Sequence, residues 1–145
     1  MKNTFYIIYK GIPLLIGITY VALCGWLLYT HDSRLVRVIM VPAVTFTGVS
    51  IFRKVYNAPR PYEVMDVKPR IPKDKKGQSF PSRHTVSASI IGMTCLYINI
   101  WMGVAVLALA LVVAFTRVYA RVHFVWDVFA GYVISIIIGI IGYWM

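Results

Sequence analysis

The chain has 145 residues, enough for one domain, and 59% of them are hydrophobic while only 14% are charged. Its mean hydropathy of +0.73 excludes an ordinary soluble domain, because a globule of this size cannot bury so much apolar surface. The net charge of +10 would indicate a nucleic-acid partner in a soluble protein. In a membrane protein it indicates anionic lipid or a phosphorylated substrate instead, so we expect no nucleic-acid partner.

Two apolar stretches near the amino terminus predict the first two membrane spans. Residues 11–29 carry no charge and, at about 1.5 Å per residue, nearly cross a hydrocarbon core of roughly 30 Å. Residues 35–52 form the second span, with Arg37 close enough to one end to reach the interface. Cys24 and Cys95 both lie in apolar stretches, so we expect free thiols rather than a disulfide.

The character of the chain changes at residue 53. Residues 53–83 form a long polar loop, and loops of that length are usually functional or disordered. The loop contains nine basic residues: Arg53, Lys54, Arg60, Lys68, Arg70, Lys73, Lys75, Lys76 and Arg83.

The second half of the chain predicts three further spans. Residues 85–116 carry no charge and would extend about 48 Å as one helix, so we expect two short helices with a turn near Asn99–Gly103. Residues 124–145 form the last span. The predicted fold is therefore an all-α integral membrane helical bundle of about five transmembrane helices, in a single domain covering residues 1–145. With five spans, the loop 53–83 and the segment 116–123 lie on the same side of the membrane.

Unusual polar residues gather in those two places. Arg60 stands between Pro59 and Pro61, which restrict the backbone on both sides of it. A guanidinium held in this way is suited to binding an oxyanion. The alternative is a proline-rich turn with a surface arginine. Ser82 and His84 stand at the predicted start of the third span, where free N–H groups attract anions. Equally, Ser82 can be a simple helix cap and His84 an interfacial histidine.

His123 and Asp127 are four residues apart, so on a helix they share a face and the carboxylate can hold one imidazole nitrogen. The other nitrogen is then available as a base, nucleophile or ligand. A structural His–Asp hydrogen bond is the alternative interpretation.

His84, His123 and Asp127 are also the only obvious ligands for a metal. The arginines around them would repel a divalent cation, so the sequence favours phosphate and predicts no metal and no cofactor.

These residues resemble the type-2 phosphatidic acid phosphatase superfamily, which has the motifs Lys-x6-Arg-Pro, Pro-Ser-Gly-His and Ser-Arg-x5-His-x3-Asp. Here the motifs read Arg53-x6-Arg60-Pro61, Pro81-Ser82-Arg83-His84 and Thr116-Arg117-x5-His123-x3-Asp127. Arginine stands at the lysine position with Lys54 beside it, Arg83 replaces glycine, and Thr116 replaces serine. One of the six spans usual in the lipid phosphatases is also missing.

The resemblance implies a role for each matching residue. His123 is expected to be the nucleophile that forms a phosphohistidine, Asp127 to orient it, and His84 to protonate the leaving oxygen. The expected phosphate-binding residues are Arg53, Arg60, Ser82 and Arg117, with Lys54 as the alternative to Arg53 and Arg83 as a candidate contact to a second phosphate or a headgroup.

The predicted function is a metal-independent phosphatase of a lipid phosphate or diphosphate, such as phosphatidic acid, phosphatidylglycerol phosphate or a polyprenyl diphosphate. A vanadate-dependent peroxidase and a non-catalytic lipid-phosphate binder or transporter are the alternatives. We expect a multi-pass cell-membrane protein. Its orientation is contested, because thirteen of the fifteen Lys and Arg residues lie on the active-site side, which favours the cytosol. The resemblance favours the external face, and that is the orientation we expect.

Overall fold

The computed structural model describes residues 2–145, with side chains from Thr4 onward. Within that range it contains six helices and no β-strand, which confirms the all-α prediction. The long helices are α1 (Lys2–Tyr29), α2 (Leu35–Tyr56), α4 (Arg83–Ile98), α5 (Ile100–Tyr119) and α6 (Val125–Trp144), and the short helix α3 (Pro61–Val64) lies in the polar loop.

Four of the long helices (α1, α2, α5 and α6) are long and apolar enough to cross a membrane. The fifth, α4, has 16 residues, or about 24 Å. It occupies the centre of the bundle and contacts all four of the other long helices. The main core cluster lies around it and includes Ile16, Leu27, Val38, Cys95 and Val113. A helical membrane bundle is therefore confirmed, and Cys24 and Cys95 are free thiols as expected.

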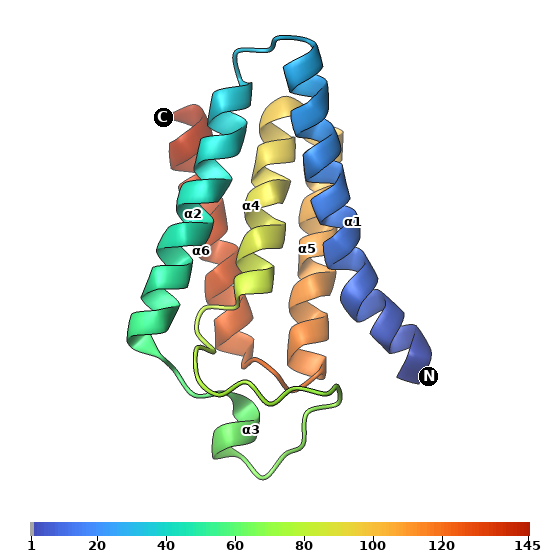
Figure 1. Cartoon of the computed structure of the whole chain (residues 1–145), viewed down its shortest axis with the longest axis vertical. Coiled ribbons are helices and arrows are strands. Elements are labelled where there is room, and N and C mark those ends of the chain that lie inside the picture. The colour runs from blue at the N-terminus through green and yellow to red at the C-terminus, as the bar shows by residue number, and fades with distance from the viewer. Residues whose placement is uncertain (1) are drawn as a thin grey trace.

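The connections between helices define two ends of the bundle (Figure 1). The turn between α1 and α2 lies at one end. The loop from α2 to α4 and the short connection from α5 to α6 both lie at the other end, which we call the loop end. Backbone contacts join these two connections, since the Arg70 N–H donates to the Ala120 carbonyl at 3.1 Å. The expectation that residues 53–83 and 116–123 share one side is thus met.

Two helices are longer than the predicted spans. α1 begins at Lys2 rather than near residue 11, and α2 continues to Tyr56 rather than ending near residue 52. Apolar patterning detects where a chain leaves lipid, whereas a helix continues until its hydrogen bonding is interrupted. For α2 the interruption is Asn57, whose left-handed backbone (φ 46°) closes the helix with an N–H bond to the Arg53 carbonyl at 3.0 Å.

The predicted turn near Asn99–Gly103 is a break at a single residue. Asn99 has an extended backbone, and its side chain accepts a hydrogen bond from the Met102 N–H at 3.0 Å, so it caps α5. Gly103 already lies in the first turns of α5. A Cβ atom there would overlap the backbone of Leu96, so glycine permits α5 to pack directly against the end of α4.

Candidate active site

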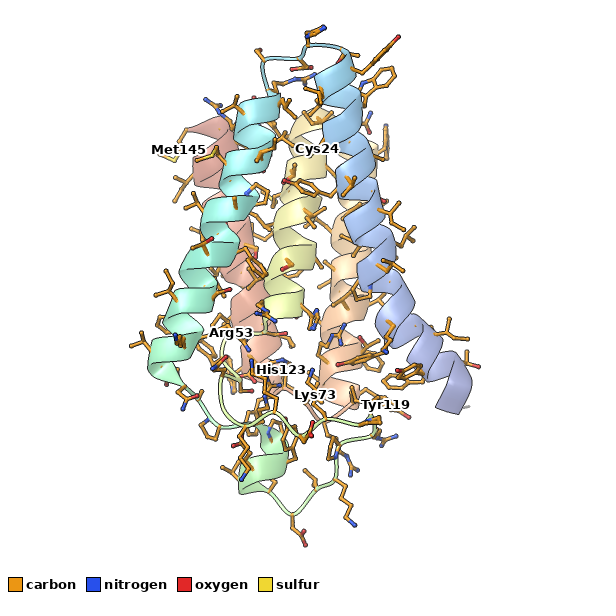
Figure 2. The ribbon with its side chains drawn as sticks, in the orientation of Figure 1. Cys24, Arg53, Lys73, Tyr119, His123 and Met145 are labelled. Carbon is orange, nitrogen blue, oxygen red and sulfur yellow. The ribbon has the colours of Figure 1, made fainter. Side chains whose placement is uncertain are left out.

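A small polar pocket lies at the loop end of the bundle, where the helices and the polar loop meet. Tyr9 comes from α1, Arg53 from α2, His84 from α4, His123 from the α5–α6 connection and Lys73 from the loop, so five separate segments converge there. Figure 2 shows Arg53, Lys73 and His123 at this end of the molecule. The complete lining is Tyr9, Arg53, Arg60, Lys73, Lys75, Arg83, His84, Val122 and His123.

Two buried arginines line the pocket and connect the loop to the bundle. Arg53, in the last turn of α2, donates to three backbone carbonyl oxygens of residues 78–81. Arg60 donates from Nε to the Gly77 carbonyl at 2.9 Å and from Nη1 to the Val122 carbonyl at 3.1 Å. Both side chains are buried. Their guanidinium groups are therefore fixed before any ligand binds, as electrostatic stabilisation of an anion requires.

His123 and Asp127 form a buried pair. His123 Nδ1 lies 3.2 Å from Asp127 Oδ2, which also accepts the Phe124 N–H at 2.9 Å. Ser79 adds a contact that the sequence did not predict: its Oγ donates to Asp127 Oδ2 and lies 3.3 Å from His123 Nδ1. With Nδ1 held by these partners, Nε2 is the ring nitrogen left for the pocket that His123 lines.

Burial lowers the pKa of His123 to about 4. The charges of Arg60 and Arg53 act in the same direction, while the hydrogen bond to Asp127 opposes them. The imidazole is therefore neutral throughout the physiological range, which is the form a nucleophile needs.

This shift predicts how stability depends on pH. Between about pH 4 and pH 6.5 the unfolded chain binds a proton at His123 that the folded protein does not, so stability rises with pH across this window. We expect roughly 3 kcal/mol from this group above pH 6.5, lost as the pH falls to 4. Unfolding temperatures in detergent should therefore fall more steeply on acidification for the wild type than for His123→Gln. Parallel curves for the two proteins would contradict the shift.

The second motif contributes unequally to the pocket. His84 and Arg83 both line it and are both exposed. The guanidinium of Arg83 also lies 5.5 Å from the centre of the Phe46 ring on α2. Ser82 is the buried N-cap residue of α4; its N–H donates to the Asp127 carbonyl at 2.8 Å and its Oγ accepts from Thr85 Oγ1 at 3.0 Å. Ser82 therefore links α4 to α6 and does not line the pocket.

Two further predicted residues lie outside the pocket lining. Lys54 is exposed and is not among the pocket-lining residues, whereas its neighbour Arg53 is, so the structure brings Arg53 and not Lys54 into the pocket. Arg117 is buried beside Tyr9, with its Cζ 3.7 Å from the ring centre and Nη2 donating to the Tyr9 carbonyl at 3.1 Å. Its Nε is buried and has no acceptor among the described residues.

Five pocket or pair residues were not predicted from the sequence: Tyr9, Lys73, Lys75, Ser79 and Val122. Tyr9 comes from α1, far from any motif, and no local pattern marks it. The lysines belonged to a loop with seven other basic residues, and nothing in the spacing separated them from the rest. Across the described residues, no cluster of three or more His, Cys, Asp or Glu side chains is arranged to hold a metal ion.

This chain is similar to known proteins in sequence and in fold. The sequence model of the PAP2 superfamily matches residues 34–145, which is most of the chain. The chain belongs to the PAP2 superfamily. The match includes every residue of the three motifs and all of the pocket except Tyr9.

Individual relatives are similar over different extents. The undecaprenyl-diphosphatase BcrC of Bacillus subtilis is 35% identical over 85 residues, which are 59% of this chain and 44% of that protein. The crystal structure of Aquifex aeolicus LpxE superposes with a TM-score of 0.77 at 27% identity, covering 94% of this chain and 83% of LpxE. A transmembrane PAP2-type phosphatidylglycerolphosphate phosphatase from Bacillus subtilis has a TM-score of 0.67 at 20% identity, covering 92% and 72% of the two chains. That last likeness shows a shared fold.

Proposed function

We propose that this PAP2 protein is a membrane-embedded, metal-independent phosphatase that hydrolyses lipid phosphates or diphosphates through a phosphohistidine. The observation that carries the proposal is the His123–Asp127 pair opening onto a pocket lined by cationic side chains. The names of two relatives, an undecaprenyl-diphosphatase and a phosphatidylglycerolphosphate phosphatase, support the same class of substrate.

In the first step, His123 Nε2 attacks the phosphorus atom in line with the bond to the leaving oxygen. That P–O bond breaks, and His84 protonates the leaving oxygen. Arg53 and Arg60 stabilise the charge on the equatorial oxygens, because their guanidinium groups are already fixed by backbone carbonyls. Asp127 keeps the proton on Nδ1 and stabilises the charge that develops on the ring.

In the second step, water attacks the phosphohistidine and releases inorganic phosphate, with His84 taking a proton from the water. The resemblance assigns phosphate contacts also to Ser82 and Arg117. Arg117 has a free donor for this purpose at Nε. Ser82 contributes through its position at the start of α4, whose amino-terminal N–H groups favour an anion.

Two other functions use the same anion pocket. A vanadate-dependent peroxidase would hold vanadate where we place phosphate, and it would need a peroxide as co-substrate. A non-catalytic lipid-phosphate binder needs the arginines but has no use for a neutral histidine whose second nitrogen is held by a carboxylate. The buried His123–Asp127–Ser79 arrangement therefore favours a catalytic function over binding alone, and a requirement for peroxide would distinguish the peroxidase from the phosphatase.

We expect phosphate release from lipid phosphates by the purified protein to survive EDTA and to be inhibited by vanadate. The positive charge around the substrate comes from arginine and lysine side chains, so no divalent cation is required, and vanadate can adopt the five-coordinate geometry of the transition state. The measurement is phosphate release in detergent with and without each reagent. Activity lost in EDTA and restored by a divalent metal would overturn the metal-free mechanism.

The protein is a multi-pass membrane protein, and we propose that its loop end faces the exterior, as the family resemblance suggests. The excess of basic residues at that end favours the opposite orientation. A cysteine introduced at exposed Asp74 distinguishes the two, because a membrane-impermeant thiol reagent labels it in intact cells only if the loop is external. Labelling only after lysis would contradict the proposal.

A further inference from the structure

The pocket contains more positive charge than one phosphate can neutralise. We propose that it accommodates both phosphoryl groups of a lipid diphosphate, and that Lys73, Lys75 and Arg83 bind the phosphoryl group that remains on the lipid. This inference rests on the phosphatase activity proposed above. It adds the preferred substrate class and the residues that select it.

The basic residues of the pocket fall into two sets. Arg53 and Arg60 are buried and donate to backbone carbonyl oxygens, so they form part of the folded framework. The side chains of Lys73, Lys75 and Arg83 form no hydrogen bond or ion pair with any other described residue, although they line the same pocket as the two histidines. They are therefore available to a ligand.

Their surroundings favour an anion with several charges. Burial lowers the pKa of Lys73, and the nearby charges of Arg60 and Arg117 lower it further. Burial also lowers the pKa of Lys75, followed by the charges of Arg83 and Arg60. Like charges held this close repel one another, and a bound polyanion removes the repulsion.

The protein itself does not supply that anion. No Asp or Glu is among the pocket-lining residues of the described chain. Asp127 is engaged by His123, Ser79 and the Phe124 N–H. Glu63 is also engaged, because its carboxylate accepts hydrogen bonds from the backbone N–H groups of Arg60 at 2.7 Å and Gly77 at 2.8 Å.

The charge of the substrate can be compared with this surplus. A phosphate monoester carries about two negative charges at neutral pH, whereas five basic side chains line the pocket. A monoester bound at Arg53 and Arg60 leaves Lys73, Lys75 and Arg83 without a counter-charge. A diphosphate adds a second anionic group that reaches them.

The groups already described are sufficient for the reaction with a diphosphate. His123 Nε2 attacks the terminal phosphorus, and the bond to the bridging oxygen breaks with its electron pair moving onto that oxygen. The lipid monophosphate leaves as an anion, and water then converts the phosphohistidine to inorganic phosphate. Cations around the leaving phosphoryl group stabilise the charge that develops on it. Arg83 is suited to this position because it adjoins His84, to which we assign the leaving oxygen.

The test compares two substrates with the same C15 prenyl chain, one a diphosphate and one a monophosphate. We expect kcat/KM of the wild-type full-length protein in detergent to be at least 10-fold higher for the diphosphate. In Lys73→Ala, Lys75→Ala and Arg83→Ala this ratio should fall, by about 10-fold or more in the strongest case. Arg83→Lys should retain most of the ratio, and Lys76→Ala should not change it, because Lys76 is an exposed loop residue outside the pocket.

The outcomes separate the two proposals. If the wild type hydrolyses neither prenyl substrate nor phosphatidic acid, the proposed phosphatase function is wrong. If it hydrolyses phosphatidic acid but neither prenyl substrate, the phosphatase stands and the diphosphate inference is overturned. If it hydrolyses both prenyl substrates and the ratio is unchanged in all three alanine variants, the phosphatase stands and the diphosphate inference is overturned; these cations then serve general membrane binding. A second measurement does not depend on variants that fold: inorganic pyrophosphate should inhibit the wild type at a concentration at least 10-fold lower than phosphate does. Equal inhibition by the two anions would also contradict the inference.

Discussion

Replacing His123 by alanine should lower phosphate release from a lipid phosphate substrate by on the order of 10⁴-fold or more, to the level of the assay blank. In our account the variant lacks the atom that forms the covalent bond to phosphorus, and loss of a nucleophile typically has effects of this size. The remaining cationic pocket still binds the substrate, so the effect appears mainly in kcat. The measurement is steady-state phosphate release with purified protein in detergent.

Asp127→Asn is the matched variant for this prediction. It retains a side chain of the same shape that bonds to His123 Nδ1 but does not stabilise the charged ring, so its loss should be large and smaller than that of His123→Ala. Gel-filtration behaviour like that of the wild type establishes that each variant is folded. Phosphate release by folded His123→Ala within 10-fold of the wild type would exclude His123 as the nucleophile.

Arg53→Ala should reduce kcat/KM by about 10²- to 10³-fold, the usual cost of removing one fixed electrostatic contact in an active site. The structure places Arg53 on the pocket and fixes its guanidinium on three carbonyl oxygens of residues 78–81. The substitution therefore removes a charge and also loosens the loop that holds Ser79. Lys54→Ala should change kcat/KM by less than about 3-fold, because Lys54 is exposed and does not line the pocket.

The comparison of these two neighbours settles which of them occupies the lysine position of the first PAP2 motif. Arg53→Lys is the informative third variant. It restores the family's residue type but cannot reach three carbonyls with a planar group, so we expect partial recovery. If Lys54→Ala lost activity and Arg53→Ala kept it, Lys54 and not Arg53 would occupy the lysine position of the motif, and the placement of Arg53 at the substrate would be wrong.

Much of the fold could be predicted because hydrophobic length and charge placement are strong constraints in a membrane protein. The uncharged stretch 85–116 is too long for one span, and the structure divides it at Asn99. The same logic placed residues 53–83 and 116–123 at one end, where Arg70 and Ala120 are in contact. The first span was predicted to begin too late because it was started after the charged Lys10, whereas α1 includes Lys10 and the apolar residues 5–9 before it.

The central residues of the site could also be predicted from the sequence. The spacing of His123 and Asp127 predicted a hydrogen-bonded pair, and the structure places Nδ1 3.2 Å from Oδ2. The pair does not share a helix face as that spacing assumed, because His123 lies in the α5–α6 connection and only Asp127 lies on α6. Pro59 and Pro61 predicted a stiff Arg60, which is buried and fixed by carbonyl oxygens. In each case the constraint is local, since neighbouring residues in the chain determine the geometry.

Contacts between distant segments could not be predicted in this way. Ser79 reaches Asp127 across 48 positions, and Arg117 reaches Tyr9 across 108. Both contacts depend on how the loop folds back and how α1 packs on α5, for which a single sequence provides no spacing rule. For the same reason, the sequence could not predict that Lys73 and Lys75 are the loop lysines that line the pocket, because this depends on how the loop folds.

Trapping the covalent intermediate is the sharpest test of whether His123 is the nucleophile. A lipid substrate labelled at its terminal phosphorus is mixed with excess enzyme and quenched within milliseconds in alkaline detergent, since a phosphohistidine bond survives base and is lost in acid. Peptide mass spectrometry then locates the label. We expect phosphate on His123 in the wild type, released by acid and absent from His123→Ala. Turnover without any labelled peptide, or label on a residue other than His123, would contradict it.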